Sequence, residues 1–293
     1  MKKSIFHNRL LPYLLVAPQL LVVLVFFFWP AFNSLRLSVF KTSPFGDVQI
    51  FVGLENFITL LTSREYYHSV VQSFIFSLGV TFSSLAGSLF LAVLANQKIR
   101  GRPLYRSALL WTFGVAPPIA GIIWLFVFHP SYGILTYLLA RITTYEFNWL
   151  LQGWIALLLV IFAASWAHLG YNIAFFLAAL QTIPQSVIEA ARIDGASGLR
   201  LFRWVTFPLL SPVTFFLFIM NMVFSFFETF GLIHAVTQGG PGDATTIMVY
   251  KTYLDGFVHM RMGLSAAQSV ILMVLVISLT VLQFRFTEKK VFY

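Results

Sequence analysis

The chain has 293 residues, of which 59% are hydrophobic and only 10% are charged, and its mean hydropathy is +0.84. Soluble globular proteins carry about 25% charged residues, so this composition excludes an ordinary soluble protein and favours a protein embedded in lipid. The formal charge of +9 would suggest a nucleic-acid partner for a soluble protein. In a membrane protein its meaning depends on where the basic residues lie. The absence of cysteine excludes a disulfide-stapled domain.

Six long stretches of the sequence lack Asp, Glu, Lys and Arg. Each can hold one helix of about 20 residues, the length that crosses the hydrocarbon core of a bilayer. The sequence therefore predicts an all-α membrane protein, a polytopic bundle of six transmembrane helices that forms one domain over residues 1–293. The predicted spans are residues 11–35, 69–96, 107–128, 155–180, 208–235 and 263–286.

The first predicted span follows a basic start with Lys2, Lys3 and Arg9, which is also how a cleaved signal peptide begins. The apolar run is longer than the about 7–15 residues of a signal peptide, and no small-residue cleavage site follows it. We therefore expect a retained first helix.

The basic residues are distributed unevenly between the two sides of this topology. If the N-terminus is cytoplasmic, most of the 19 Lys and Arg residues fall in cytoplasmic segments, as the positive-inside rule requires. Acidic residues have the opposite bias. We therefore expect both termini in the cytoplasm, and the excess of positive charge then calls for no nucleic acid.

Two local features predict how the helices pack. Gly79, Ser83 and Gly87 recur every four residues on the second span, a strip of small residues that lets another helix approach closely. Pro117 and Pro118 should break or kink the third span, since neither supplies a backbone donor. A broken helix is tolerated at membrane depth where it faces protein or a water-filled cavity, which favours a transport protein over simple packing.

Several chemistries have no sequence signature here. There is no G-x-x-x-x-G-K-[ST] phosphate loop, no H-E-x-x-H pattern and no carboxylate cluster for a metal, so we expect no cofactor bound by this chain. A proton-coupled carrier would need ionisable groups at mid-membrane, and a membrane-embedded lipid enzyme would need clustered acids or histidines. The sequence has neither kind of residue, so we expect the energy for transport to come from a partner.

Polar residues on the fourth and fifth spans are the candidates for a solute path, because polar side chains in hydrocarbon tend to face a cavity or another helix. Hydrogen bonding between helices is at least as good an explanation for each one alone. The candidates are His168, Tyr171, Asn172, Asn221, Ser225 and Glu228.

A polar segment, residues 182–205, lies between the fourth and fifth spans on the predicted cytoplasmic side. Pro184 suits the first position of a helix and Gly195 a left-handed stop, so a short helix with apolar and charged faces is predicted between them. A second short helix is predicted from Gly198 to Val205. The pair could lie on the membrane surface or dock into another protein, and the pattern alone leaves both possibilities open.

This segment resembles the E-A-A-x3-G-x9-I-x-L-P loop of the permeases of binding-protein-dependent ABC importers. The matching residues are Glu189, Ala190, Ala191, Gly195 and Val205-Thr206-Phe207-Pro208, with conservative replacements at two positions of the last part. In that family the loop forms a coupling helix that seats in a cleft of the ATPase subunit. The resemblance implies that the Ala pair permits close docking, the Glu offers a charge to the ATPase, and the Gly permits the turn between two short helices.

Further segments are similar to the sugar-type permeases of the maltose-uptake class, and most of all to the A-type permeases of glycerol-3-phosphate uptake systems. The likeness covers nearly the whole chain. Sister systems for sugars and for glycerophosphodiesters share most of these segments. The similar segments are Leu11–Pro18, Phe51–Phe57, Gly239–Pro241, Ala244–Thr246 and Ser265–Ser269.

The resemblance implies a non-catalytic permease subunit in the bacterial inner membrane. Its partners would be a second homologous permease, two ATPase subunits that use ATP and Mg, an extracytoplasmic solute-binding protein and membrane lipid. Alternating access would carry sn-glycerol-3-phosphate or a related glycerophosphodiester, with a sugar importer as the alternative. Residues Leu54 to Tyr67 and Thr237 to Asp255 would face the binding protein.

Overall fold

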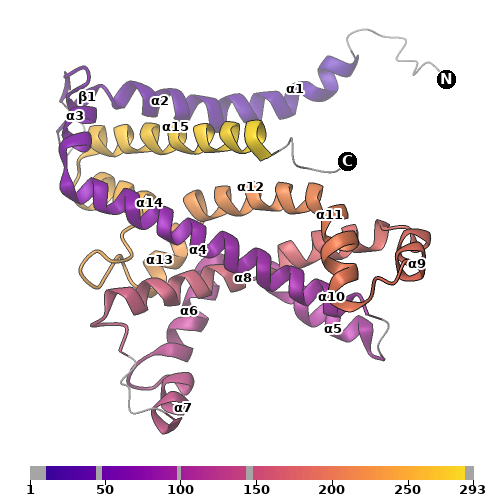
Figure 1. Ribbon diagram of the computed structural model, residues 1–293. Coiled ribbons are helices and arrows are strands. Elements are labelled where there is room, and N and C mark those ends of the chain that lie inside the picture. Colours follow the sequence, from indigo (N-terminus) through magenta and orange to yellow (C-terminus); the bar gives the residue numbers. More distant parts are fainter. Residues whose placement is uncertain (1–10, 44–47, 98–99, 143–147, 288–293) are drawn as a thin grey trace. The chain divides into compact units, whose positions relative to one another are not determined.

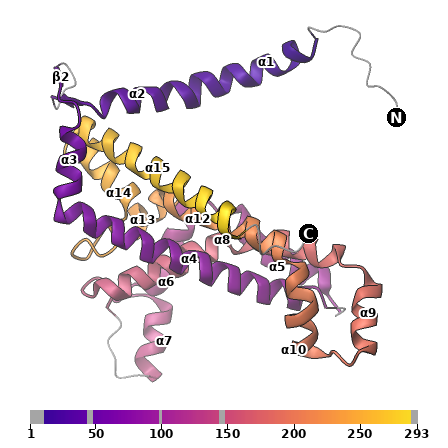
Figure 2. The same ribbon diagram turned by 45° about the horizontal axis from the view of Figure 1, so that its top comes forward.

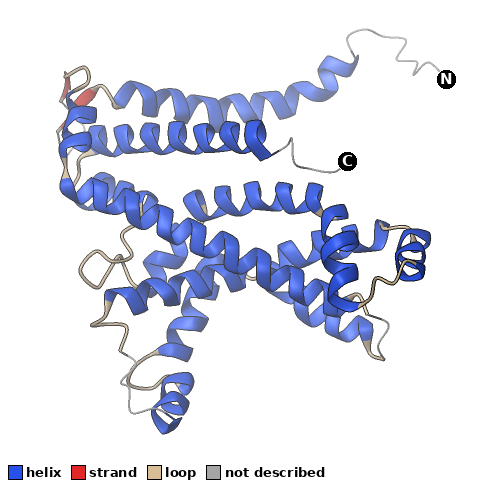
Figure 3. Ribbon diagram, viewed as in Figure 1, coloured by secondary structure: helices blue, strands red, loops and turns tan. Residues whose placement is uncertain are grey.

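The computed structural model describes residues 11–43, 48–97, 100–142 and 148–287. Helices dominate this part of the chain, and the strands within it form one short hairpin (Figures 1 and 3). The chain divides into two compact units. The first comprises residues up to Ser63 together with Thr252–Met273, and the second comprises Arg64–Lys251 together with residues from Val274 onward.

The first unit begins with a helix in which none of residues 12–37 is buried. It runs as α1 (Leu11–Val23), a π-helical turn (Leu24–Phe28) and α2 (Trp29–Leu37). Residues 12–37 have a mean hydropathy of 2.2, enough to cross a membrane. Most of its apolar side chains are therefore exposed.

The first unit continues with a β-hairpin and a short helix that are joined through Asn56. Strands β1 (Phe40–Thr42) and β2 (Gln49–Phe51) pair antiparallel, and α3 (Glu55–Thr62) follows them. The Asn56 amide donates to the carbonyl oxygens of Ser38 (2.9 Å) and Phe40 (3.0 Å), which fixes α3 against the hairpin. The unit also contains a π-helical turn, Leu254–Val258, and the first part of α15 (Met262–Thr287).

The second unit holds most of the helices. Two long helices, α4 and α8, pack along each other at its centre (Figure 1). The other elements are short or broken. In chain order the unit contains α4 (Arg64–Ala95), α5 (Arg102–Leu110), the 3-10 turn Trp111–Gly114, α6 (Pro117–Phe128), α7 (Ile134–Ile142), α8 (Gly153–Thr182), α9 (Gln185–Ile193), α10 (Gly198–Leu201), the π turn Phe202–Thr206, α11 (Phe207–Leu209), α12 (Ser211–Phe227), α13 (Phe230–Val236), most of α14 (Met248–Tyr253) and the end of α15.

The strip of small residues on α4 does form a helix–helix interface, as the sequence predicts. A Cβ added at Gly79 would lie 2.8 Å from the Ile161 Cδ1 atom of α8, so no larger residue fits there without movement. One turn further on, the hydroxyls of Ser83 and Ser165 lie 2.6 Å apart. The small side chains therefore allow α4 and α8 to approach closely.

The predicted break at the two prolines is also present. α5 and the 3-10 turn end before Ala116, which is extended (φ −62°, ψ 142°) as a residue before proline prefers. α6 then starts at Pro117, and the two parts are bent by 106°. The predicted span 107–128 is therefore two helical pieces.

The predicted fifth span, residues 208–235, is wrong as a single helix. A bend of 70° separates Gly198–Leu209 from α12, and α12 ends at Phe227 before the separate α13 begins at Phe230. Pro212 at the start of α12 cannot donate to a preceding carbonyl, so a continuous helix is interrupted there.

Within the described residues, four helices are long and apolar enough to cross a membrane, and the number rises to six if each bent pair counts as one span. The six apolar stretches of the sequence thus match four continuous helices and two broken ones. The structure supports an all-α membrane bundle in which the third and fifth stretches are bent.

Candidate functional site

The loop that carries the E-A-A resemblance forms a helix with a well-defined end. The sequence predicts Pro184 as the first residue of the helix. In the structure Pro184 is the N-cap, and α9 starts one residue later, at Gln185. After Asp194 the chain turns at Gly195 with φ +85°. The Gly195 N–H donates to the Arg192 carbonyl (3.0 Å), and the Ala196 N–H donates to the Ala191 carbonyl (2.9 Å). This pair of bonds is a Schellman motif, which requires the left-handed residue that glycine supplies.

α9 has no buried residue. Glu189 and Ala190 are exposed, Ala191 is half-buried, and no hydrogen bond or ion pair joins the Glu189 side chain to any described residue. Ile193 at the end of the helix is 86% exposed. Figure 2 shows α9 and α10 side by side at one end of the second unit. Glu189, Ala190 and Ala191 therefore lie on a short amphipathic helix without a buried residue, and Gly195 forms the turn that follows it.

The second short helix differs from the prediction. α10 covers only Gly198–Leu201, and a π-helical turn, Phe202–Thr206, continues it. The two elements together fill the predicted range of residues 198–205, so the backbone stays helical but changes its pitch.

Two of the candidate path residues are paired with each other at the centre of the second unit. Asn172 on α8 and Asn221 on α12 are fully buried and exchange reciprocal amide bonds of 3.1 and 2.9 Å. Asn172 also donates to the Ser84 hydroxyl on α4 (2.7 Å), and Asn221 donates to the Leu217 carbonyl (2.7 Å). The amide groups therefore tie three helices together in this conformation.

A second group of candidates forms an aromatic stack. The His168 ring lies on Phe224 with a centroid distance of 4.0 Å and on Tyr171 with 4.9 Å. The His168 Nε2 atom is buried and has no partner within the described residues. The structure thus brings together His168 and Tyr171 and adds Phe224, an apolar residue that a search for polar groups misses.

The two remaining candidates do not join either group through a hydrogen bond. Ser225 is buried, and its hydroxyl donates to the Met222 carbonyl (2.9 Å). Glu228 is exposed and caps the C-terminal end of α12.

Ser84 was missing from the candidates, although the sequence contains a signal for it. It belongs to a row of buried small hydroxyl residues on α4 with spacings of three and four, which places them on one face of the helix. The row is Ser69, Ser73, Ser77, Thr81, Ser84 and Ser88.

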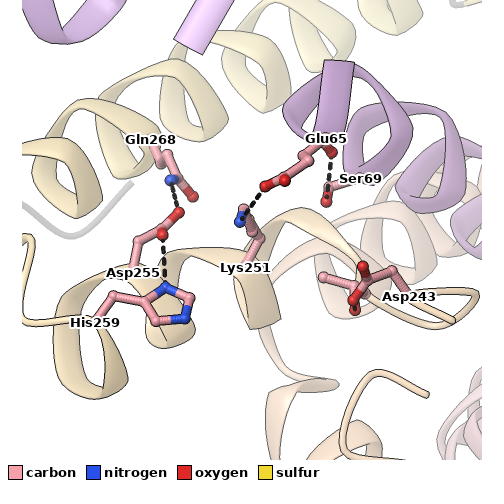
Figure 4. Close-up of polar contacts among 8 residues, drawn as sticks. Glu65, Ser69, Asp243, Lys251, Asp255, His259 and Gln268 are labelled. Atoms are coloured by element: carbon pink, nitrogen blue, oxygen red, sulfur yellow. Dashed lines mark hydrogen bonds and ion pairs between the residues drawn. The ribbon is translucent and has the colours of Figure 1, made fainter. Parts of the chain in front are cut away.

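Charged contacts occur in the segments expected to face a binding protein (Figure 4). In the second unit, Lys251 Nζ lies 3.4 Å from a carboxylate oxygen of Glu65. In the first unit, the buried Asp255 carboxylate accepts from Gln268 Nε2 (2.6 Å) and contacts His259 Nδ1 (3.0 Å). A buried carboxylate needs such partners to offset its desolvation.

Comparison with known proteins gives a consistent picture. Residues 79–291 match the family described as the binding-protein-dependent transport system inner membrane component. The sn-glycerol-3-phosphate transport system permease proteins UgpA of Rhizobium meliloti (strain 1021) and Agrobacterium fabrum (strain C58 / ATCC 33970) are each 50% identical to this chain, and each alignment covers 100% of both proteins.

A solved structure shares the fold. It is the crystal structure of a bacterial alginate ABC transporter in complex with a periplasmic protein that has an alginate pentasaccharide bound. The match has a TM-score of 0.82 and 18% identity, and it covers 95% of this chain and 94% of the other. With a family model that covers most of its length and relatives identical at half of their positions, this chain belongs to the family of binding-protein-dependent transport system inner membrane components.

Proposed function

We propose that the chain is the permease subunit of an ATP-driven importer for sn-glycerol-3-phosphate. The observation that carries the proposal is identity over the full length: the relatives at 50% identity that are named as permeases for this solute align from end to end. The chain itself would have no catalytic role. Nucleotide hydrolysis would be carried out by two partner ATPase subunits that use ATP and Mg.

The exposed α9 is the proposed contact with an ATPase subunit. Its exposed Glu189 has no partner in the described chain, and Ala190 and Ala191 place no bulky side chain between the α9 backbone and a docking surface. The turn at Gly195 redirects the chain immediately after the helix. A short amphipathic helix of this kind fits a groove on a second protein. Movement of the ATPases would then be transmitted to α8 and α12, which flank the loop.

The remaining parts of the proposed importer are a second homologous permease and an extracytoplasmic solute-binding protein. The segments Leu54–Tyr67 and Thr237–Asp255 would face the binding protein. A periplasmic partner of this kind is present in the related alginate transporter complex.

We place the solute path along the aromatic stack of His168, Tyr171 and Phe224, where a buried imidazole nitrogen has no partner within the described residues. Asn172 and Asn221 satisfy each other in this conformation and would reach a solute only if α8 and α12 separate.

The substrate is tested with the complete complex in proteoliposomes that contain ATP. Uptake of labelled glycerol-3-phosphate, glycerophosphocholine and maltose is compared in the presence of the binding protein. We expect ATP-dependent uptake of glycerol-3-phosphate. Preferential uptake of maltose would make the chain a sugar permease, and uptake without the ATPase subunits would overturn the proposal.

The orientation can be tested directly because the chain has no cysteine. A single cysteine is introduced at Ser186 on α9 or at Thr59 on α3, both of which are exposed. With α9 in the cytoplasm, an impermeant thiol reagent labels Ser186→Cys only in inside-out vesicles and Thr59→Cys only in right-side-out vesicles. The reverse result would invert the proposed topology.

A further inference from the structure

The second unit contains an apolar cavity of about 520 Å³ between α4, α8 and the α11–α12 segment. Phe82 is 60% exposed and Phe207 is 42% exposed, so the cavity opens at the surface of this unit. Five phenylalanine side chains contribute to its walls: Phe82, Phe176, Phe207, Phe215 and Phe218.

The cavity does not suit the transported solute. Its walls are almost entirely hydrocarbon, and the Thr214 hydroxyl that borders it already donates to the Leu210 carbonyl (2.9 Å). A glycerol phosphate buried here would lose its hydrogen bonds to water and gain none, which costs several kcal/mol. The chemistry of the lining selects a hydrocarbon chain.

The size of the cavity distinguishes a lipid chain from a protein helix. One turn of helix with its side chains is about 5.4 Å long and about 10 Å wide, and so fills roughly 400 Å³. The cavity would therefore hold little more than a single turn of a neighbouring helix. A flexible acyl chain is thin enough to enter between the phenylalanine rings.

A basic residue precedes the cavity-lining Phe207 in the chain. Arg203 is four residues before the cavity-lining Phe207, and the π-helical turn Phe202–Thr206 joins them, so the two residues lie about one helical turn apart. The Arg203 side chain is exposed and makes no hydrogen bond or ion pair with any described residue. The neighbouring Trp204 is 72% exposed, and exposed Trp beside Arg is typical of the boundary between hydrocarbon and lipid headgroups.

We propose that this cavity binds one acyl chain of an anionic phospholipid whose phosphate is contacted by Arg203. The cavity accounts for the chain and the unpaired guanidinium for the preference for negative charge. A lipid held there contacts α12 and the helical segment that leads to α9, the segment that must move if α9 transmits force.

The proposal can be tested by photo-crosslinking of the assembled transporter in nanodiscs without nucleotide, so the result is independent of transport. The crosslinker p-benzoylphenylalanine replaces Phe218, which lines the cavity, or the nearby Phe216, which is 42% exposed on α12 and does not line it. Adducts are identified by mass spectrometry in phosphatidylglycerol and in phosphatidylcholine. We expect a lipid adduct at position 218 several-fold stronger than at 216, and stronger with phosphatidylglycerol.

Two further variants separate the two parts of the site. Ala86→Trp fills the cavity and should abolish the adduct at position 218. Arg203→Gln should remove the preference for phosphatidylglycerol, whereas the control Arg192→Gln on α9 should not. Equal adducts at 216 and 218, an adduct with the second permease in place of lipid, or a lipid preference that survives Arg203→Gln would each overturn the proposal.

Discussion

Helix α9 and the Ser84–Asn172–Asn221 cluster, both in the second unit, differ in the burial of their polar residues. α9 buries none of its residues, whereas the two asparagines of the cluster have no exposed surface. In the cluster, every donor of the two amide groups has a partner within the chain. On α9, the Glu189 carboxylate has none among the described residues.

This difference separates polar groups that hold helices together from polar groups that are available to a partner. A buried amide is costly unless it is hydrogen-bonded, so the cluster contributes to the cohesion of α4, α8 and α12. An exposed carboxylate stays hydrated and needs no partner within the chain. The Glu189 carboxylate is therefore available to bind a docking partner. Variants in the two regions should therefore produce different kinds of defect.

The largest effect is expected for Glu189→Gln. If the carboxylate is buried against the ATPase, its loss costs on the order of 2–5 kcal/mol at that interface, and ATP-driven uptake should fall roughly tenfold or more while the permease still folds. Uptake and thermal stability are measured on the same complex.

Asp194→Asn is the matched control for that variant. It removes an exposed carboxylate at the C-cap of the same helix and should leave uptake close to wild type. If the two variants behave alike, the assignment of Glu189 to docking is wrong.

A smaller effect, and one on stability, is expected for Asn172→Leu. The change leaves the Asn221 amide without its partner, which costs on the order of 1–3 kcal/mol. The detergent-solubilised complex should unfold at a lower temperature, and the double variant with Asn221→Leu should lose less than the sum of the two single variants. Strict additivity would show that the two amides act independently.

The turn after α9 should respond to backbone conformation rather than to side-chain size. Gly195→Ala places a Cβ in the left-handed region at a cost of about 1–2 kcal/mol, which should lower uptake by fraying the end of α9. Gly195→Asn should retain more uptake despite its larger side chain, because asparagine tolerates this conformation. Equal loss in both variants would indicate that docking requires the absence of a side chain.

The smallest effect is expected at the ion pair between Lys251 and Glu65. The Glu65 side chain is 81% exposed, although the Lys251 side chain is only 15% exposed. Solvent therefore reaches the pair through Glu65 and screens it, and such a pair contributes on the order of 1 kcal/mol. Lys251→Met should therefore change the unfolding temperature little. A large loss of uptake with unchanged stability would instead place Lys251 in contact with another protein.

Much of the architecture could be predicted from the sequence. The lack of charge over six stretches predicts membrane helices, because a charged side chain in hydrocarbon is costly wherever the helix packs. Pro117 and Gly195 predict a break and a left-handed turn, since both effects are local to the backbone. The strip at Gly79 and Ser83 predicts a helix–helix interface, because small side chains at this spacing let another helix approach closely.

Other features depended on contacts between residues far apart in the chain. No local pattern indicates that Asn172 meets Asn221 and Ser84, or that Phe224 covers His168. The bend before α12 and the end of that helix at Phe227 also differ from the predicted continuous span of residues 208–235. The sequence by itself determined which segments can cross a membrane and where the backbone must turn, because hydrophobicity and backbone geometry are properties of each residue. The tertiary structure decided which polar groups are paired and which are left for a partner, because pairing is a property of two residues brought together in space.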